Sequence, residues 1–167
     1  MNYLLDTNII VYYYTPKPEY NQLRDVLNNE KNILYILNIQ IPEVIATFYK
    51  FHYNPDKDGL VLTLEEANSY RNEFILDIRK NKFFVLSIMD RDIIFTDKIW
   101  EVAEKVYPEM EKKHDFISAI DCILLAVADT LNKTKGIKND FKLLSNDNHM
   151  LKTAEKFNIP FERPKLF

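Results

Sequence analysis

The stretch Tyr3-Leu4-Leu5-Asp6-Thr7-Asn8-Ile9-Ile10-Val11, close to the N-terminus, decides the fold class of this chain. Its first three residues are apolar and predict a buried β-strand, and the apolar pattern resumes after the polar segment at residues 6–8. A carboxylate at the point where a buried strand gives way to a helix occupies the place where α/β folds build their sites. Taken alone, Asp6 is also explained as the N-cap of the following helix.

The rest of the chain alternates strand-like and helix-like segments. Further strands are predicted over residues 33–38, 83–89 and 141–144, with a short edge strand beginning at Phe161. Helices are predicted over residues 19–29, 41–51, 63–80, 90–107, 117–131 and 152–157. This alternation predicts an α/β fold with a mostly parallel sheet. For the helix over residues 90–107, the expected core positions are Ile94, Trp100, Ala103 and Val106.

The composition fits a globular protein and excludes several classes of function. The chain has 167 residues, of which 47% are hydrophobic and 28% charged, and we expect one domain over residues 1–167. With two glycines, it has neither a P-loop nor a glycine-rich dinucleotide-binding turn. Cys122 is the single cysteine, which excludes an internal disulfide and a cysteine-based zinc site. No leader peptide or membrane-spanning stretch is recognisable, so we expect a cytoplasmic protein.

Three further carboxylates lie at positions that draw attention. Asp147 follows the strand at residues 141–144, Glu43 lies in the first turn of its predicted helix, and Asp121 interrupts an apolar helix face. Each has a purely structural explanation: an N-cap for Asp147, a partner of the helix dipole for Glu43, and a buried ion pair or boundary position for Asp121. However, no Lys or Arg lies within one turn of Asp121 to supply such an ion pair.

Considered together, these carboxylates predict a metal site. The strand-to-helix junctions of a parallel sheet open on one edge, so Asp6, Glu43 and Asp147 are expected to converge there, with the Asp121 helix packed across that edge. Clustered carboxylates resist ionising together, and a divalent cation removes that penalty. Oxygen ligands without Cys or His favour Mg²⁺ or Mn²⁺, which activates water and neutralises a phosphoryl oxygen.

Other side chains near these segments leave alternatives open. His149 either contacts a substrate or is a core or solvated residue. Several lysines are either solvated or contact RNA phosphates, namely Lys112, Lys113, Lys133, Lys135, Lys138 and Lys152. A set of aromatic residues either belongs to the core or lines an apolar groove for a partner's helix, namely Tyr12, Tyr13, Tyr14, Phe48 and Tyr49.

The ordered motifs Asp6-Thr7-Asn8, Pro42-Glu43-Val44, Ile117-Ser118-Ala119-Ile120-Asp121 and Ser145-Asn146-Asp147 resemble the PIN domain family. Its best-populated branch is the VapC-type toxin ribonucleases of toxin–antitoxin pairs. The resemblance spans residues 2–160 and rests on the order and structural context of these short motifs.

The resemblance implies a Rossmann-like three-layer α/β/α sandwich and an endoribonuclease that depends on Mg²⁺ or Mn²⁺. Carried over by motif, the metal ligands are Asp6, Glu43, Asp121 and Asp147, with Asn8 and Ser145 as polar supports. RNA is then the substrate, and we expect a homodimer silenced by a small antitoxin protein. An Arg from such a partner could pair with Asp6 and Asp121 and displace the metal.

Two other interpretations are open at this stage. A haloacid dehalogenase-like phosphohydrolase also has an Asp after its first strand, but it needs a second Asp where this chain has Asn8. A catalytically silent PIN-like module that binds RNA or protein would lack one of the acidic positions, and none is missing here. The sequence leaves open the RNA target, the number of metal ions and the role of the Lys-rich insertion Lys133–Asp140.

Overall fold

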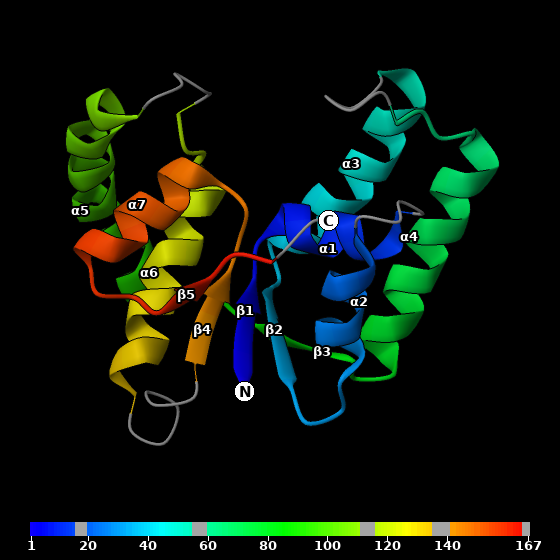
Figure 1. Ribbon diagram of the computed structural model, residues 1–167, viewed down its shortest axis with the longest axis horizontal. Coiled ribbons are helices and arrows are strands. Elements are labelled where there is room, and N and C mark those ends of the chain that lie inside the picture. Colours follow the sequence, from blue (N-terminus) through cyan, green and yellow to red (C-terminus); the bar gives the residue numbers. More distant parts are fainter. Residues whose placement is uncertain (16–19, 55–59, 111–115, 135–140, 165–167) are drawn as a thin grey trace.

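A five-stranded, all-parallel sheet lies at the centre of the protein (Figure 1). The computed structural model describes residues 1–15, 20–54, 60–110, 116–134 and 141–164. Its strands are β1 (Asn2–Leu5), β2 (Ile33–Leu37), β3 (Phe83–Leu86), β4 (Phe141–Leu144) and β5 (Phe161–Glu162). In space they follow the order β3-β2-β1-β4-β5, so the chain builds outward from β1 first on one side and then on the other. The strand order therefore reverses between β1 and β4, the place where open α/β sheets form their binding crevices.

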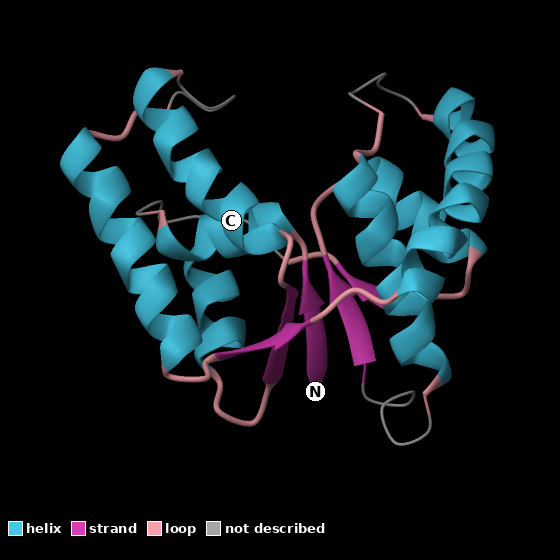
Figure 2. Ribbon diagram, turned by 180° about the vertical axis from the view of Figure 1, so that it is seen from behind, coloured by secondary structure: helices cyan, strands magenta, loops and turns pink. Residues whose placement is uncertain are grey.

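Helices cover both faces of the sheet in two groups (Figures 1 and 2). The first group contains α1 (Thr7–Tyr14), α2 (Asn21–Asn28), α3 (Gln40–Tyr53) and α4 (Leu64–Arg79). The second contains α5 (Asp90–Val106), the short 3-10 helix η2 (Tyr107–Glu109), α6 (Ala119–Lys133) and α7 (Asn148–Lys156). Within the described ranges, every helix is too short or too polar to cross a bilayer.

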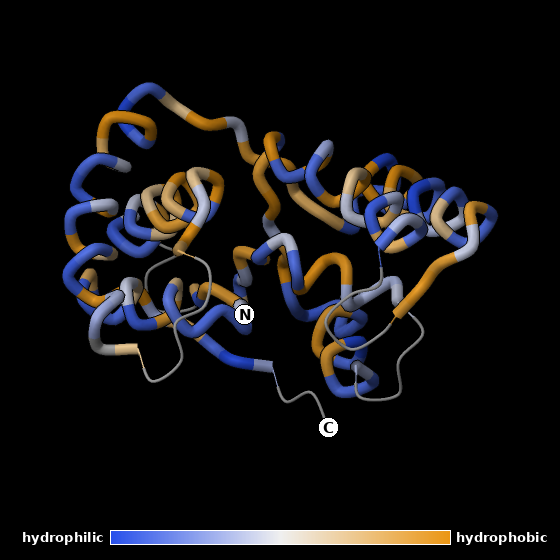
Figure 3. Tube along the Cα trace, turned by 90° about the horizontal axis from the view of Figure 1, so that it is seen from above, coloured by the Kyte–Doolittle hydropathy of each residue, from blue (hydrophilic) through white to orange (hydrophobic). Residues whose placement is uncertain are grey.

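Each face of the sheet has its own hydrophobic core. Along β1, Tyr3 and Leu5 pack into the core shared with α1, α3 and α4, while Leu4 packs into the core shared with α5, α6 and α7. This alternation follows from the two-residue period of a strand. Hydrophobic and hydrophilic stretches alternate along the helices (Figure 3). The predicted three-layer α/β/α sandwich is thereby confirmed.

The prediction that Ile94 belongs to the core is wrong, because this residue is 76% exposed. The buried apolar residues of α5 are Ile99, Ala103 and Val106, whose spacing of four and three follows one helix face. Ile94 lies five residues before Ile99, about 140° away around a helix of 3.6 residues per turn. Trp100 is half-buried beside this face.

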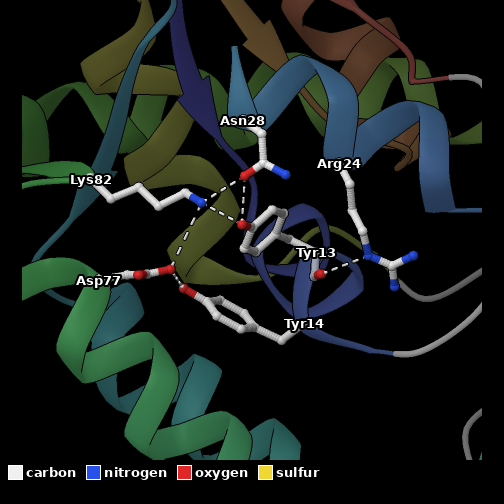
Figure 4. Close-up of polar contacts among 6 residues, drawn as sticks. All are labelled: Tyr13, Tyr14, Arg24, Asn28, Asp77 and Lys82. Carbon is white, nitrogen blue, oxygen red and sulfur yellow. Dashed lines mark hydrogen bonds and ion pairs between the residues drawn. The ribbon is translucent and has the colours of Figure 1, made fainter. Parts of the chain in front are cut away.

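Two of the aromatic residues considered for a partner groove belong to the interior: Tyr14, at the end of α1, and Phe48, on α3. Phe48 is fully buried and Tyr14 is 8% exposed, and their rings meet edge to face with centroids 5.9 Å apart. The Tyr14 hydroxyl donates a hydrogen bond of 2.8 Å to Asp77 on α4 (Figure 4). Lys82 contacts the Tyr13 hydroxyl and Asp77, which ties α1 to the segment between α4 and β3. The groove alternative is thus excluded for Tyr14 and Phe48.

Candidate active site

Asp6 and Ser145 meet where β1 and β4 end side by side. Leu5 pairs with Leu144 in the sheet, and the Asp6 N–H continues the ladder by donating to the Leu144 carbonyl at 3.0 Å. The Ser145 hydroxyl then donates to Asp6 Oδ2 at 2.8 Å. Both side chains are buried, with Asp6 2% exposed and Ser145 fully covered. The central strand and its neighbour therefore deliver a buried, hydrogen-bonded carboxylate to the switch point of the sheet.

Asp147 follows on the same loop and caps α7. Its Oδ1 accepts a hydrogen bond of 2.7 Å from the Met150 N–H, so the N-cap interpretation is confirmed. The Asp147 N–H donates to Ser145 Oγ at 3.0 Å. Ser145 consequently links Asp147 to Asp6, because its hydroxyl accepts a hydrogen bond from the Asp147 N–H and donates one to the Asp6 carboxylate. Capping engages one carboxylate oxygen and leaves ligation by the other compatible with it.

Asp121 lies in the first turn of α6 and not within its apolar face. We expected this helix to begin at Ile117, but Ser118 is its N-cap and Ala119 its first residue. The Ser118 N–H donates to Asp121 Oδ2 at 2.7 Å, and the Asp121 N–H donates to Ser118 Oγ at 3.1 Å. This is a reciprocal capping box, which satisfies two free donors at the helix start. The Ser-x-x-Asp spacing was the sequence signal for it. Across the described ranges, no cation forms an ion pair with Asp121, as the ion-pair alternative would require.

Glu43 occupies the first turn of α3, where we expected it, but its contacts involve two residues that sequence reasoning missed. Its Oε2 accepts a hydrogen bond of 2.5 Å from the Thr7 hydroxyl. Thr7 in turn accepts a hydrogen bond of 3.2 Å from Gln40, a fully buried residue. Thr7 lies 33 residues before Gln40 and 36 before Glu43 in the sequence, and no local pattern links it to them.

Electrostatics shows that the four carboxylates act on one another. Burial raises the pKa of Asp6 to about 7, with further increases from Asp121 and Asp147 that outweigh the Ser145 hydrogen bond and the Asn8 backbone amide. Burial also raises the pKa of Asp121, against the opposing hydrogen bonds from Ser118 and with added repulsion from Asp147 and Glu43. Acidic side chains from both sides of the switch point therefore lie close enough to influence one another electrostatically.

The four carboxylates supply oxygen ligands of the kind that a hard divalent cation prefers, although their side chains do not converge on one point. In the part of the chain that the structure describes, no group of three or more carboxylate, imidazole or thiolate side chains stands ready to hold an ion. The side-chain hydrogen bonds engage Oδ2 of Asp6, Oε2 of Glu43, Oδ2 of Asp121 and Oδ1 of Asp147. A cation that contacted the opposite oxygens would bind all-oxygen ligands of the kind that Mg²⁺ and Mn²⁺ prefer.

The remaining candidates lie in different surroundings. Asn8 has an exposed side chain, and its backbone amide acts on Asp6. His149 is 2% exposed, has Nε2 2.9 Å from the Ala103 carbonyl and packs against Tyr107, which favours the core interpretation.

Two of the flanking lysines, Lys133 and Lys152, lie in the part of the chain that the structure describes. Lys133 is the last residue of α6, not part of a loop, and pairs with Asp129 at 2.5 Å. Lys152 is half-buried on α7. The others lie outside the described residues, as does most of the Lys-rich insertion: Lys112, Lys113, Lys135 and Lys138.

Comparison with known proteins gives a consistent result. The family model described as "PIN domain" matches residues 3–156. The fold is similar to that of VapBC2 from Rickettsia felis bound to a promoter DNA fragment, with 20% identity, a TM-score of 0.56 and coverage of 98% of this chain and 99% of that one. DNA-bound VapBC from Salmonella typhimurium gives 20% identity, a TM-score of 0.58 and coverage of 98% of each chain. FitAcB from Neisseria gonorrhoeae gives 17% identity, a TM-score of 0.59 and coverage of 95% of each chain. No curated protein sequence matches.

Proposed function

Because this chain belongs to the PIN domain family of nucleases, we propose that it is a Mg²⁺- or Mn²⁺-dependent endoribonuclease. The observation that carries the proposal is the buried Asp6, whose pKa is raised to about 7 by burial and by the neighbouring Asp121 and Asp147. A protein gains nothing in stability from such an arrangement, and strongly perturbed carboxylates cluster at functional sites. The family match also overturns the haloacid dehalogenase-like alternative.

In the proposed mechanism, Asp6, Asp121 and Asp147 would hold the cation, and Glu43 would be a further ligand or would orient the attacking water. When bound, the cation neutralises the carboxylates, polarises the phosphoryl group and makes water a better nucleophile. Ser145 keeps Asp6 and the Asp147 backbone in place through its two hydrogen bonds. Water attacks phosphorus and gives up a proton as the new P–O bond forms, the bond to the leaving ribose oxygen breaks, and that oxygen takes up a proton.

We further propose that the protein is the VapC-type toxin of a toxin–antitoxin pair. The similar structures named VapBC and FitAcB support this part through fold alone, since their identity to this chain is 16–20%. A small antitoxin that inserts an Arg between Asp6 and Asp121 would neutralise both carboxylates and exclude the metal. A homodimer and a cytoplasmic location belong to the same proposal.

Cleavage of RNA by purified protein under a Mg²⁺ or Mn²⁺ titration tests the chemistry. Asp6→Asn and Asp121→Asn should each lower the cleavage rate by more than the roughly 10–100-fold that loss of an outer-shell partner costs. Asp97→Asn, which neutralises an exposed carboxylate on α5, is the matched control and should cleave like the parent.

Two results would contradict the proposal. Parent-like cleavage by both site variants would refute the assignment of the carboxylates. A folded parent that binds RNA but never cleaves it, at any metal concentration, would instead identify a catalytically silent module. Expression of the parent in a bacterium should arrest growth and that of Asp6→Asn should not; normal growth with active nuclease would argue against the toxin role.

A further inference from the structure

We infer that Thr7 and Gln40 are positioning residues that hold the Glu43 carboxylate as a fixed acceptor in the active site, and this inference rests on the proposed function. Three hydrogen bonds carry it: Gln40 Nε2 to the Leu5 carbonyl at 2.9 Å, Gln40 Nε2 to Thr7 Oγ1 at 3.2 Å, and Thr7 Oγ1 to Glu43 Oε2 at 2.5 Å. They join the end of β1 to the first turn of α3.

The backbone fixes which way the Gln40 amide points. The Leu37 N–H can only donate, and it lies 2.8 Å from Gln40 Oε1. The Leu5 carbonyl can only accept, so the amide nitrogen must face it. With its oxygen and nitrogen assigned in this way, Gln40 uses its second N–H to donate to Thr7. The amide is fully buried. If it were turned over, its NH2 group would face the Leu37 N–H, donor against donor, and its oxygen would face the Leu5 carbonyl, acceptor against acceptor.

The direction of the Thr7 proton follows. A hydroxyl has one proton, and the Gln40 amide nitrogen cannot accept it. The acceptor at 2.5 Å is Glu43 Oε2, so the orientation of Gln40 directs the Thr7 proton at the Glu43 carboxylate. Thr7 is 7% exposed, which leaves little room for water to take over this contact. Oε2 is thereby held as an acceptor, and Oε1 is left to meet a cation or a water.

The same dipeptide also sets the spacing between two acids. Asp6 turns toward Ser145 on the β4 side, while its neighbour Thr7 turns toward Glu43 on the β2 side. A Glu side chain has three rotatable bonds and would otherwise sample many positions at a half-buried site. Catalytic groups held within a fraction of an ångström react faster than loosely held ones, and outer-shell partners of ligands supply that restraint.

The test compares Thr7→Val, which removes the hydroxyl at constant shape, with Thr7→Ser, which restores it. The matched control is Thr47→Val on α3, since the Thr47 hydroxyl donates to the backbone carbonyl of Glu43 at 2.9 Å and not to its carboxylate. We expect Thr7→Val to lower kcat for RNA cleavage about 10–100-fold with little change in KM. Thr7→Ser and Thr47→Val should stay within a few-fold of the parent. If Thr7→Val fails to fold, Thr7→Ala is used, because it leaves space for a water to accept from Gln40.

A double-mutant cycle with Glu43→Ala separates positioning from general structural damage. Single-turnover cleavage and Mn²⁺ affinity without RNA, by calorimetry, are measured for each variant. If Thr7 acts through Glu43, then Thr7→Val costs nothing further in the Glu43→Ala background. An equal loss in both backgrounds, or a Thr7→Val protein that behaves like Thr47→Val, overturns the inference. If Glu43→Ala itself cleaves and binds Mn²⁺ like the parent, the proposed role of Glu43 fails instead.

Discussion

Replacement of Asp6 by Asn should stabilise the metal-free protein at neutral and alkaline pH, although it removes activity. Burial, together with Asp121 and Asp147, raises the pKa of Asp6 from the usual 3.8 to about 7. Between these two pH values the folded protein holds a proton that the unfolded chain has released. Stability therefore falls as pH rises through this window, and the parent carries the full penalty above about pH 7.

The magnitude follows from the pKa difference. A tenfold change in proton affinity corresponds to about 1.4 kcal/mol, so the penalty at alkaline pH approaches about 4 kcal/mol. Asn is uncharged and its carbonyl can still accept from the Ser145 hydroxyl. Its buried amide hydrogens offset part of the gain, at about 1–3 kcal/mol for an unsatisfied donor. We expect a net increase of about 1–3 kcal/mol in the free energy of unfolding at pH 8, which shrinks toward zero or reverses below pH 5.

Urea unfolding in the presence of a chelator, at pH 5 and pH 8, measures this difference between Asp6→Asn and the parent. Asp97→Asn is again the control, because that side chain is exposed on α5. Added Mn²⁺ should stabilise the parent and reduce the difference in the free energy of unfolding between it and Asp6→Asn, since a ligand that binds only the folded state adds to stability. A difference in stability that is the same at both pH values would refute the argument, because an Asp6 that titrates between them must make the difference depend on pH.

Three further predictions rest on single hydrogen bonds. Ser145→Ala should raise the pKa of Asp6 further, because it removes a donor to the ionised form; the pH at which Mn²⁺ affinity reaches half its maximum, measured by calorimetry, should shift upward. Gln40→Leu should lower the free energy of unfolding in urea by about 1–3 kcal/mol, since it strips a buried partner from the Leu37 N–H. Thr63→Ala should lower the free energy of unfolding by about 1 kcal/mol, and with it the melting temperature, because it removes the side-chain acceptor from the capping box of α4.

The sequence was sufficient for the sheet and for the acids at its edge, and the reason is local. Asp6 and Asp147 follow apolar runs that can only be buried strands, and every parallel strand ends on the same side. The capping box at the start of α6 was also within reach, since Ser118 and Asp121 have the required spacing. We missed it because Ile117 extended the apolar pattern by one position and made the helix look longer than it is.

What the sequence could not reveal depends on contacts between distant segments. The Thr7–Glu43 bond joins α1 to α3 and needs the separation of β1 and β2 to be known before either residue can be singled out. Gln40 reads as an ordinary polar residue next to a helix start, yet it is fully buried by the two strand ends that it connects. The exposure of Ile94 has a similar cause, because the phase of α5 is set by which face meets α6 and α7.

The carboxylates of this site must be held in place and must also keep their negative charge, and these two requirements usually compete. A cluster of buried carboxylates destabilises a fold, so the surrounding structure must hold each one without neutralising it. Here hydroxyl and backbone donors do this: Ser145 for Asp6, Thr7 for Glu43 and the Ser118 backbone for Asp121. None of these donors carries a charge, so each fixes an orientation while leaving the negative potential of the site intact. A lysine or arginine in the same place would stabilise the protein more, but it would also remove the attraction for a cation. Neutral donors around a cluster of acids are therefore what the proposed divalent-cation site requires.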